Sequence, residues 1–187
     1  MPKDPTNLIW VDLEMTGLDP DRCCIIEIAS IVTSIDLEVL AEGPNLVIHA
    51  TADELETLSD WSREFFTKNG LIERVKASTI TRAEAERATL DFIKEWVPEG
   101  ASPLCGNSIH NDRAFLWRQM RELHDYCHYR NVDVSSIKHV LKGWYPDRYA
   151  PPEKAASHEA LQDIRESVEE LKYYRAAFMT PTSSPEA

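Results

Sequence analysis

The sequence has few residues of the kinds that build disulfide-stabilised or membrane-spanning proteins. Its four cysteines show no CxxC spacing, and the adjacent Cys23 and Cys24 are a poor start for a disulfide framework. No apolar run approaches the roughly 20 residues that a membrane-spanning helix needs, and the first residues lack the apolar core of a signal peptide. We therefore expect reduced thiols, a cytoplasmic location and no membrane contact.

Basic residues are also scarce, with 20 Lys and Arg against 32 Asp and Glu and a formal net charge of −12. Proteins that bind long duplex nucleic acid gain their affinity from many Lys and Arg contacts to phosphates. The composition argues against that class. A short nucleic-acid substrate stays possible, because Mg²⁺ in an acidic site holds one or two phosphates without a basic surface.

The length of 187 residues and the hydrophobic content of 43% fit one globular domain. We expect this domain to span residues 1–179 and to be followed by a disordered tail at 180–187, which has little to bury. Alternating apolar patterns and turn residues predict strands at 8–13, 24–33, 37–48, 103–107 and 131–134. Helical periodicity predicts helices at 52–58, 62–69, 72–77, 82–96, 112–123 and 137–144, and one from about 157. The pattern is that of an α/β protein whose first three strands form an antiparallel meander.

Two carboxylates interrupt the first predicted strand. Strand side chains alternate with period two, so Asp12 and Glu14 project from the same face with Cα atoms roughly 6.5–7 Å apart. Buried like charges are costly unless they are paired or bind a metal, which favours a divalent ion between them. In the alternative interpretation Glu14 ends the strand in solvent and Asp12 caps a turn.

Further acids stand at helix starts. Asp112 opens a middle helix, where capping and the helix dipole alone would favour a carboxylate. Asp163 lies about 100° from Ile164, at the border of the apolar stripe of the last helix, and from there it can face the strand carboxylates. Glu27, in the second strand, is better explained as a strand-face residue or as the partner of a cation.

Taken together, these residues resemble a known family. The chain is similar to the DEDDh group of 3′→5′ exonucleases and, within it, to the oligoribonuclease family. The similarity covers nearly the whole chain and rests on residues 10–18, 26–29, 105–108, 128–130, 133–135, 157–158 and 163–167. One departure is His110-Asn111, where related chains often have Gly-Gln, and we expect it to alter loop contacts but not the metal site.

The resemblance implies a ribonuclease H-like fold, a mixed β-sheet flanked by helices, and a metal-dependent phosphodiester hydrolase. Two Mg²⁺ or Mn²⁺ ions would be held by Asp12, Glu14, Asp112 and Asp163, because in-line attack on a phosphodiester requires stabilisation of both the entering and the leaving oxygen. His158 would be the general base. Five residues of helix rotate by about 140°, so His158 and Asp163 cannot share a helical face. We therefore place His158 in the loop or first turn.

The implied substrates are short single-stranded oligoribonucleotides, down to dinucleotides, cut to 5′-mononucleotides in the final step of RNA degradation. Leu18 and Trp61 would contact the bases, and Tyr129 would be contributed across a homodimer interface. The group that would close around the 5′ phosphate is Ser108, Arg130 and Ser135. Simpler roles stay open for these residues: a core aromatic for Trp61, a surface cation for Arg130 and helix caps for the serines.

Two rival functions are compatible with parts of the pattern. A DNA exonuclease or proofreading subunit on the same fold would share the five catalytic residues but act on longer single strands. An acidic, non-catalytic adaptor would use its carboxylates only for solvation, and it would show no metal-dependent hydrolysis.

Overall fold

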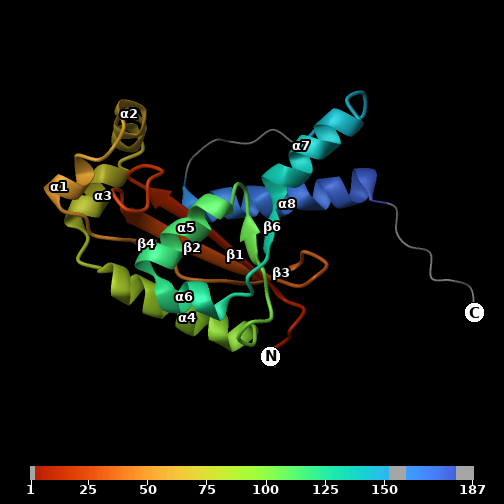
Figure 1. Ribbon diagram of the computed structural model, residues 1–187, viewed down its shortest axis with the longest axis horizontal. Helices are drawn as coiled ribbons and strands as arrows, with labels where there is room; N and C mark the ends of the chain where they lie inside the picture. Colours follow the sequence, from red (N-terminus) through yellow and green to blue (C-terminus); the bar gives the residue numbers. More distant parts are fainter. Residues whose placement is uncertain (1–2, 152–158, 180–187) are drawn as a thin grey trace, which may run out of the picture.

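The computed structural model describes residues 3–151 and 159–179 (Figure 1). In chain order, their elements are β1 (Leu8–Met15), β2 (Ile25–Thr33), β3 (Val39–Glu42), β4 (Leu46–Val47), α1 (Ala52–Leu55), α2 (Asp60–Lys68), α3 (Leu71–Ala77), α4 (Arg82–Trp96), β5 (Leu104–Gly106), α5 (His110–Gln119), α6 (Arg121–Tyr126), β6 (Asn131–Asp133), α7 (Val134–Trp144) and α8 (Ala160–Phe178). The predicted tail at 180–187 lies outside this range.

One mixed sheet organises the molecule. Its strand order is β3-β2-β1-β5-β6, and β4 also pairs with β2. β1 is antiparallel to β2 and parallel to β5, so it occupies the middle of the sheet. The predicted meander of the first strands and the predicted α/β class with a mixed sheet are confirmed.

The two faces of β1 belong to different cores. Val11 and Leu13 pack into the core that α4, α5 and α6 cover, whereas Trp10 packs into the core that α7 and α8 cover. Figure 1 shows α8 crossing one face of the sheet and α4 lying on the other. Because side chains alternate along a strand, Asp12 and Glu14 continue the Trp10 face and lie on the side of α8.

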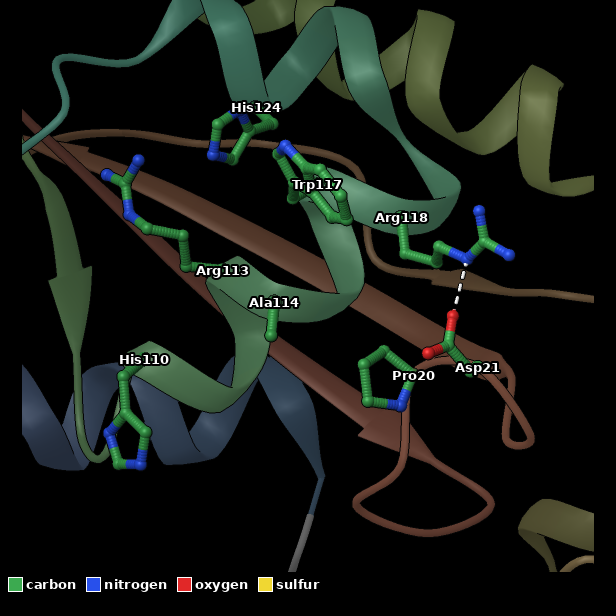
Figure 2. A pocket seen from close by; sticks show the side chains of 8 residues that line it. All are labelled: Pro20, Asp21, His110, Arg113, Ala114, Trp117, Arg118 and His124. Atoms are coloured by element: carbon green, nitrogen blue, oxygen red, sulfur yellow. Dashed lines mark ion pairs between the residues drawn. The ribbon is translucent and has the colours of Figure 1, made fainter.

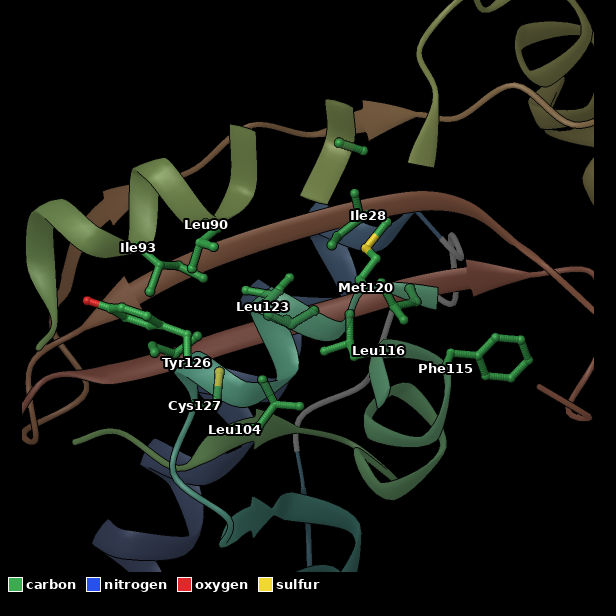
Figure 3. Close-up of a cluster of buried hydrophobic side chains, with 14 of the residues drawn as sticks. Ile28, Leu90, Ile93, Leu104, Phe115, Leu116, Met120, Leu123, Tyr126 and Cys127 are labelled. Atoms are coloured by element: carbon green, nitrogen blue, oxygen red, sulfur yellow. The ribbon is translucent and has the colours of Figure 1, made fainter. Parts of the chain in front are cut away.

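The helix predicted over 112–123 is interrupted in the structure. α5 ends at Gln119, and Met120 has φ −139° and ψ 66°, outside the helical region. Its side chain is fully buried, and Figure 3 shows it beside Leu116 and Leu123, in a cluster that also contains Leu90 and Ile93 of α4. The break lets α5 and α6 each turn an apolar side toward the sheet, which one straight helix does not do.

Helix starts follow side-chain capping. A capping box of Thr81 and Glu84 is present at the start of α4, the helix predicted over 82–96. The alternative role of Ser135 as a helix cap is wrong for α7. Asp133 is the cap: its side chain accepts a hydrogen bond from the backbone N–H of Ser135. A carboxylate at this position also interacts favourably with the positive end of the helix dipole.

Smaller differences concern the region before α4. Trp61 was expected between two helices but lies inside α2, one residue after the start of that helix. α1 is a single turn, shorter than predicted. The last helix was expected to begin near 157–158; its described part begins at Ala160, and residues 152–158 lie outside the described range.

The four cysteines are all free thiols, as expected. Burial raises the pKa of the Cys127 thiol to about 11, so this group is not a thiolate at neutral pH. Among the residues that the structure describes, no helix combines the length and the apolar character needed to cross a membrane.

Candidate metal and substrate site

Three carboxylates from opposite ends of the chain meet on the α8 side of the sheet. Asp12 and Glu14 come from β1 and Asp163 from the first turn of α8. One side-chain oxygen of each lies within 4.8 Å of the other two. The alternation of side chains along β1 and the position of Asp163 beside the apolar stripe of α8 therefore bring these three predicted residues together.

Asp112 joins this group in a different way. It lies in the first turn of α5 and is 5% exposed. Its Oδ1 accepts a hydrogen bond of 3.0 Å from the backbone N–H of Leu13, the residue between Asp12 and Glu14. Asp112 thus stands beside the strand carboxylates but is outside the group of three that lies within 4.8 Å.

The electrostatics of the site disfavour ionised carboxylates without a counter-charge. Burial, with the neighbouring Asp112, Glu14 and Asp163, raises the pKa of Asp12 well above its usual range. Burial, followed by the charges of Asp163, Glu27 and Asp112, raises the pKa of Glu14 to about 9. Burial raises the pKa of Asp112 to about 7, although the backbone hydrogen bond from Leu13 opposes the shift. A cation at this position would relieve the repulsion.

The donor set fits divalent ions with a preference for oxygen. All the ligands offered by the group of three are carboxylates, as Mg²⁺ and Mn²⁺ prefer, whereas zinc sites use mainly Cys and His. The site therefore supports the use of divalent metal.

Glu27 is a further buried acid beside this group. It stands directly across from Glu14 in the β1–β2 ladder, and its Oε1 pairs with Arg74 at 3.5 Å. Burial raises its pKa, and the charge of Arg74 opposes this shift. Of the two interpretations of Glu27, the structure therefore shows the second, in which it is the partner of a cation.

The two predicted phosphate-binding serines lie side by side. Ser108 Oγ is 3.2 Å from Ser135 Oγ, and the backbone N–H of Ser108 donates to both Ser135 Oγ and Asp133 Oδ1 at 3.0 Å. Ser108 has φ +50°, in the left-handed region that non-glycine residues seldom adopt. The loop between β5 and α5 is thereby held in one conformation.

Three further predicted contact residues are exposed. Leu18 is 73%, Trp61 63% and Tyr129 74% exposed. Trp61 stacks on Phe65 with ring centroids 5.5 Å apart, so the alternative of a core aromatic is wrong. The Arg130 guanidinium lies over the Tyr129 ring, 5.2 Å from its centroid. His158 lies outside the described residues.

Sequence reasoning did not single out Arg113. Its guanidinium donates to Asn131 Oδ1 and to the backbone carbonyls of His128 and Arg130. These bonds hold the segment that carries Tyr129 and Arg130 against α5. No sequence pattern indicated this role for Arg113, because two of its three partners are backbone carbonyl oxygens, which every residue has.

A separate hollow of about 460 Å³ lies on the outer side of α5 (Figure 2). Its lining consists of Pro20, Asp21, His110, Arg113, Ala114, Trp117, Arg118 and His124. Arg118 forms an ion pair with Asp21 at 2.8 Å. His110 Nδ1 lies 3.7 Å from Asp133 Oδ2, at the end of β6. None of the four predicted metal ligands lines this hollow.

Comparison with known proteins decides the family. A family model described as exonuclease matches residues 9–171. The oligoribonuclease of Actinobacillus pleuropneumoniae is 54% identical over 176 residues, which cover 94% of this chain and 96% of the relative. The oligoribonuclease of Escherichia coli K12 is 52% identical over 179 residues, which cover 96% and 99%. The chain belongs to the oligoribonuclease family of exonucleases. It is therefore a hydrolytic nuclease.

Solved structures agree with this fold. An apo exonuclease I matches with a TM-score of 0.69 at 14% identity, over 95% of this chain. Exonuclease I from Methylocaldum szegediense matches with a TM-score of 0.67 at 18% identity, over 92%. This chain spans 43% and 41% of the lengths of those two proteins. At such low identity the likeness establishes the fold, which is ribonuclease H-like.

Proposed function

We propose that this oligoribonuclease family member hydrolyses short oligoribonucleotides from the 3′ end, down to dinucleotides, and releases 5′-mononucleotides. This would be the final step of RNA degradation in the cytoplasm. The observation that carries the proposal is the meeting of Asp12, Glu14 and Asp163 within 4.8 Å, beside the buried Asp112. Relatives more than 50% identical along nearly their whole length carry the name oligoribonuclease.

The proposed cofactors are two Mg²⁺ or Mn²⁺ ions. Asp12, Glu14, Asp112 and Asp163 would hold these ions, directly or through water. When bound, such ions stabilise the entering and the leaving oxygen of an in-line displacement. The chain's own contribution is a fixed set of carboxylates, because β1 is held in mid-sheet and Asp112 is tied to it through Leu13.

His158 is the proposed general base. In the sequence it precedes Ala160, the first residue of α8, and Asp163 lies in the first turn of that helix. An imidazole with an ordinary pKa of about 6.5 takes a proton from water efficiently near neutral pH. The carboxylates, which would be occupied by metal, are not available for that role.

The proposed substrate contacts come from the resemblance to the exonuclease family, and the exposure of Leu18, Trp61 and Tyr129 supports them. Leu18 and Trp61 would contact the bases, and stacking on an aromatic ring is tolerant of sequence. Ser108, Ser135 and Arg130 would bind the 5′ phosphate, which would limit substrate length. Tyr129, which is exposed in the single chain, would complete the site of a second copy in a homodimer.

The test is hydrolysis of a ladder of 5′-phosphorylated RNAs of two to about ten nucleotides, with Mn²⁺ or with a chelator. We expect the highest kcat/KM on the dinucleotide, release of 5′-mononucleotides, and no turnover with chelator. Single-stranded DNA of the same lengths is the control. Equal or better rates on long DNA would contradict the substrate and favour the proofreading type of exonuclease.

A further inference from the structure

A set of hydrogen bonds connects α8 to the proposed 5′-phosphate site. Asn107, at the end of β5, donates through Nδ2 to Ser167 Oγ at 2.6 Å and to Glu170 Oε2 at 3.5 Å. On its other side, Asn107 Oδ1 accepts from Ser135 Oγ at 3.0 Å. One amide therefore joins the helix that carries Asp163 to a serine proposed to bind the substrate.

The orientation of this amide is determined by its partners on α8. Glu170 is 1% exposed, and a carboxylate can only accept hydrogen bonds. The Ser167 hydroxyl donates to the backbone carbonyl of Asp163 at 2.8 Å, so its oxygen accepts from Asn107. Asn107 must then direct its NH₂ group toward α8 and its carbonyl toward Ser135.

This orientation determines how Ser135 can act. Its hydroxyl proton is directed to Asn107, so its oxygen accepts from the backbone N–H of Ser108 at 3.0 Å. The same N–H also donates to Asp133. Two acceptors thus hold Ser108 at φ +50°, a conformation that costs free energy unless its surroundings impose it.

We propose that Asn107, held by Ser167 and Glu170, is a positioning residue of the 5′-phosphate site, which acts through Ser135 on the conformation of Ser108. The N–H of Ser108 donates to Asp133 and Ser135, and its hydroxyl donates to Ser135 Oγ at 3.2 Å, so the Ser108 hydroxyl oxygen is held at a fixed place. The proposal deepens the proposed function and rests on it, because it assigns to α8 the control of 5′-phosphate recognition in addition to its metal ligand.

The other contacts of Glu170 make a conservative variant informative. Glu170 Oε1 accepts from the Tyr174 hydroxyl at 2.5 Å and lies 3.3 Å from Lys138 Nζ. Both partners are donors. In Glu170→Gln they retain the one carbonyl oxygen, and the new NH₂ group faces the NH₂ group of Asn107. Asn107 then loses one of its two acceptors on α8 and meets a donor in its place, whereas Ser167 Oγ at 2.6 Å remains. The size of residue 170 is unchanged.

The experiment compares kcat and KM on a 5′-phosphorylated and a 5′-hydroxyl RNA dinucleotide. We expect Glu170→Gln and Asn107→Leu to raise KM for the phosphorylated substrate by roughly tenfold, the loss of about one hydrogen bond to a charged group. The 5′-hydroxyl substrate and kcat should change little. Glu169→Gln is the matched control, since Glu169 is a neighbouring exposed acid paired with Lys172.

The sign of the effect separates positioning from simple electrostatics. Removal of a negative charge at Glu170 would, by charge alone, tighten binding of a phosphate. Positioning predicts weaker binding. Tighter binding in Glu170→Gln, or equal loss on both substrates, would overturn the proposal.

A second measurement does not depend on activity. Amide hydrogen exchange of Ser108, followed by NMR, should be several-fold faster in Glu170→Gln and in Asn107→Leu than in wild type and Glu169→Gln. Unchanged exchange would overturn the proposal whatever the enzyme cleaves. A wild-type protein that hydrolyses neither dinucleotide would instead overturn the proposed function. The exchange data would still test the positioning of Ser108 in that case.

Discussion

The backbone N–H of Leu13 donates to the Asp112 carboxylate at 3.0 Å and fixes a buried acid of α5 against the central strand. Leu13 lies between two proposed metal ligands on β1. Neighbouring β5 pairs with β1 only at Ile9 and Trp10, and Asp112 supplies the acceptor for Leu13. The carboxylate therefore has one role in the fold and a second, proposed role in the metal site.

Substitution of Asp112 should separate those roles. Asp112→Asn keeps an oxygen that accepts from Leu13, so we expect a melting temperature in chelator equal to or above that of wild type, with hydrolysis reduced more than 100-fold. Asp112→Ala leaves a buried N–H without its acceptor, which costs about 1–3 kcal/mol. Thermal melting and dinucleotide hydrolysis measure both effects. Equal stability of the two variants would show that the hydrogen bond contributes little.

The metal-free protein should lose stability as pH rises. Glu14 has a folded-state pKa of about 9 and Asp112 of about 7, against about 4 in an unfolded chain. The folded state therefore binds more protons between those values, and the free energy of unfolding decreases from about pH 4 to pH 9. Denaturant unfolding in chelator at several pH values measures this slope.

Divalent metal should reverse this trend. Ions that bind the folded state stabilise it by mass action, and they do so more as the carboxylates lose their protons. Mn²⁺ should thus raise the melting temperature more at pH 8 than at pH 5. Glu14→Gln is the comparison, because it removes a buried acid whose pKa is raised to about 9 and should flatten the pH slope in chelator. A Mn²⁺ effect independent of pH would contradict the assignment of the site.

His158→Ala should separate turnover from metal binding. The imidazole is proposed to accept a proton and not to bind metal, so the variant should bind Mn²⁺ like wild type in calorimetry. Turnover should decrease by roughly 10²–10⁴-fold. The control is His49→Ala, an exposed histidine before α1. Loss of Mn²⁺ binding in His158→Ala would show that the proposed role is wrong.

Trp61→Ala should weaken substrate binding without a large effect on stability. The ring is 63% exposed, so truncation leaves no buried cavity. Loss of one base stack should raise KM for RNA by roughly tenfold. Trp144→Ala is the matched control, since Trp144 is 69% exposed at the end of α7. An equal change in both variants would argue against a base contact at Trp61.

The sequence predicts those parts of the site that depend on local periodicity. The common face of Asp12 and Glu14 follows from the strand repeat, and the position of Asp163 follows from its place beside the apolar stripe of α8. The resemblance to exonucleases supplied the roles of these residues.

Other features depend on contacts between distant segments. Asn107 meets Glu170 only after β5 and α8 have packed together, and nothing local in either segment indicates the contact. The break at Met120 was missed for a related reason, and at α7 the cap is the acid Asp133 in place of the serine that follows it. In both places tertiary packing or a side-chain hydrogen bond overrides the helical pattern.

The spacing of Asp163, Ser167 and Glu170 on α8 has a consequence for how this helix can vary. Steps of four and three residues keep all three on one side of the helix, toward β1 and β5. One inserted residue between Asp163 and Ser167 would turn the following part by about 100° and move it by about 1.5 Å. The metal ligand and the Asn107 contact would then be out of phase. We therefore expect substitutions on the opposite side of α8 to be tolerated better than a change in the length of this segment.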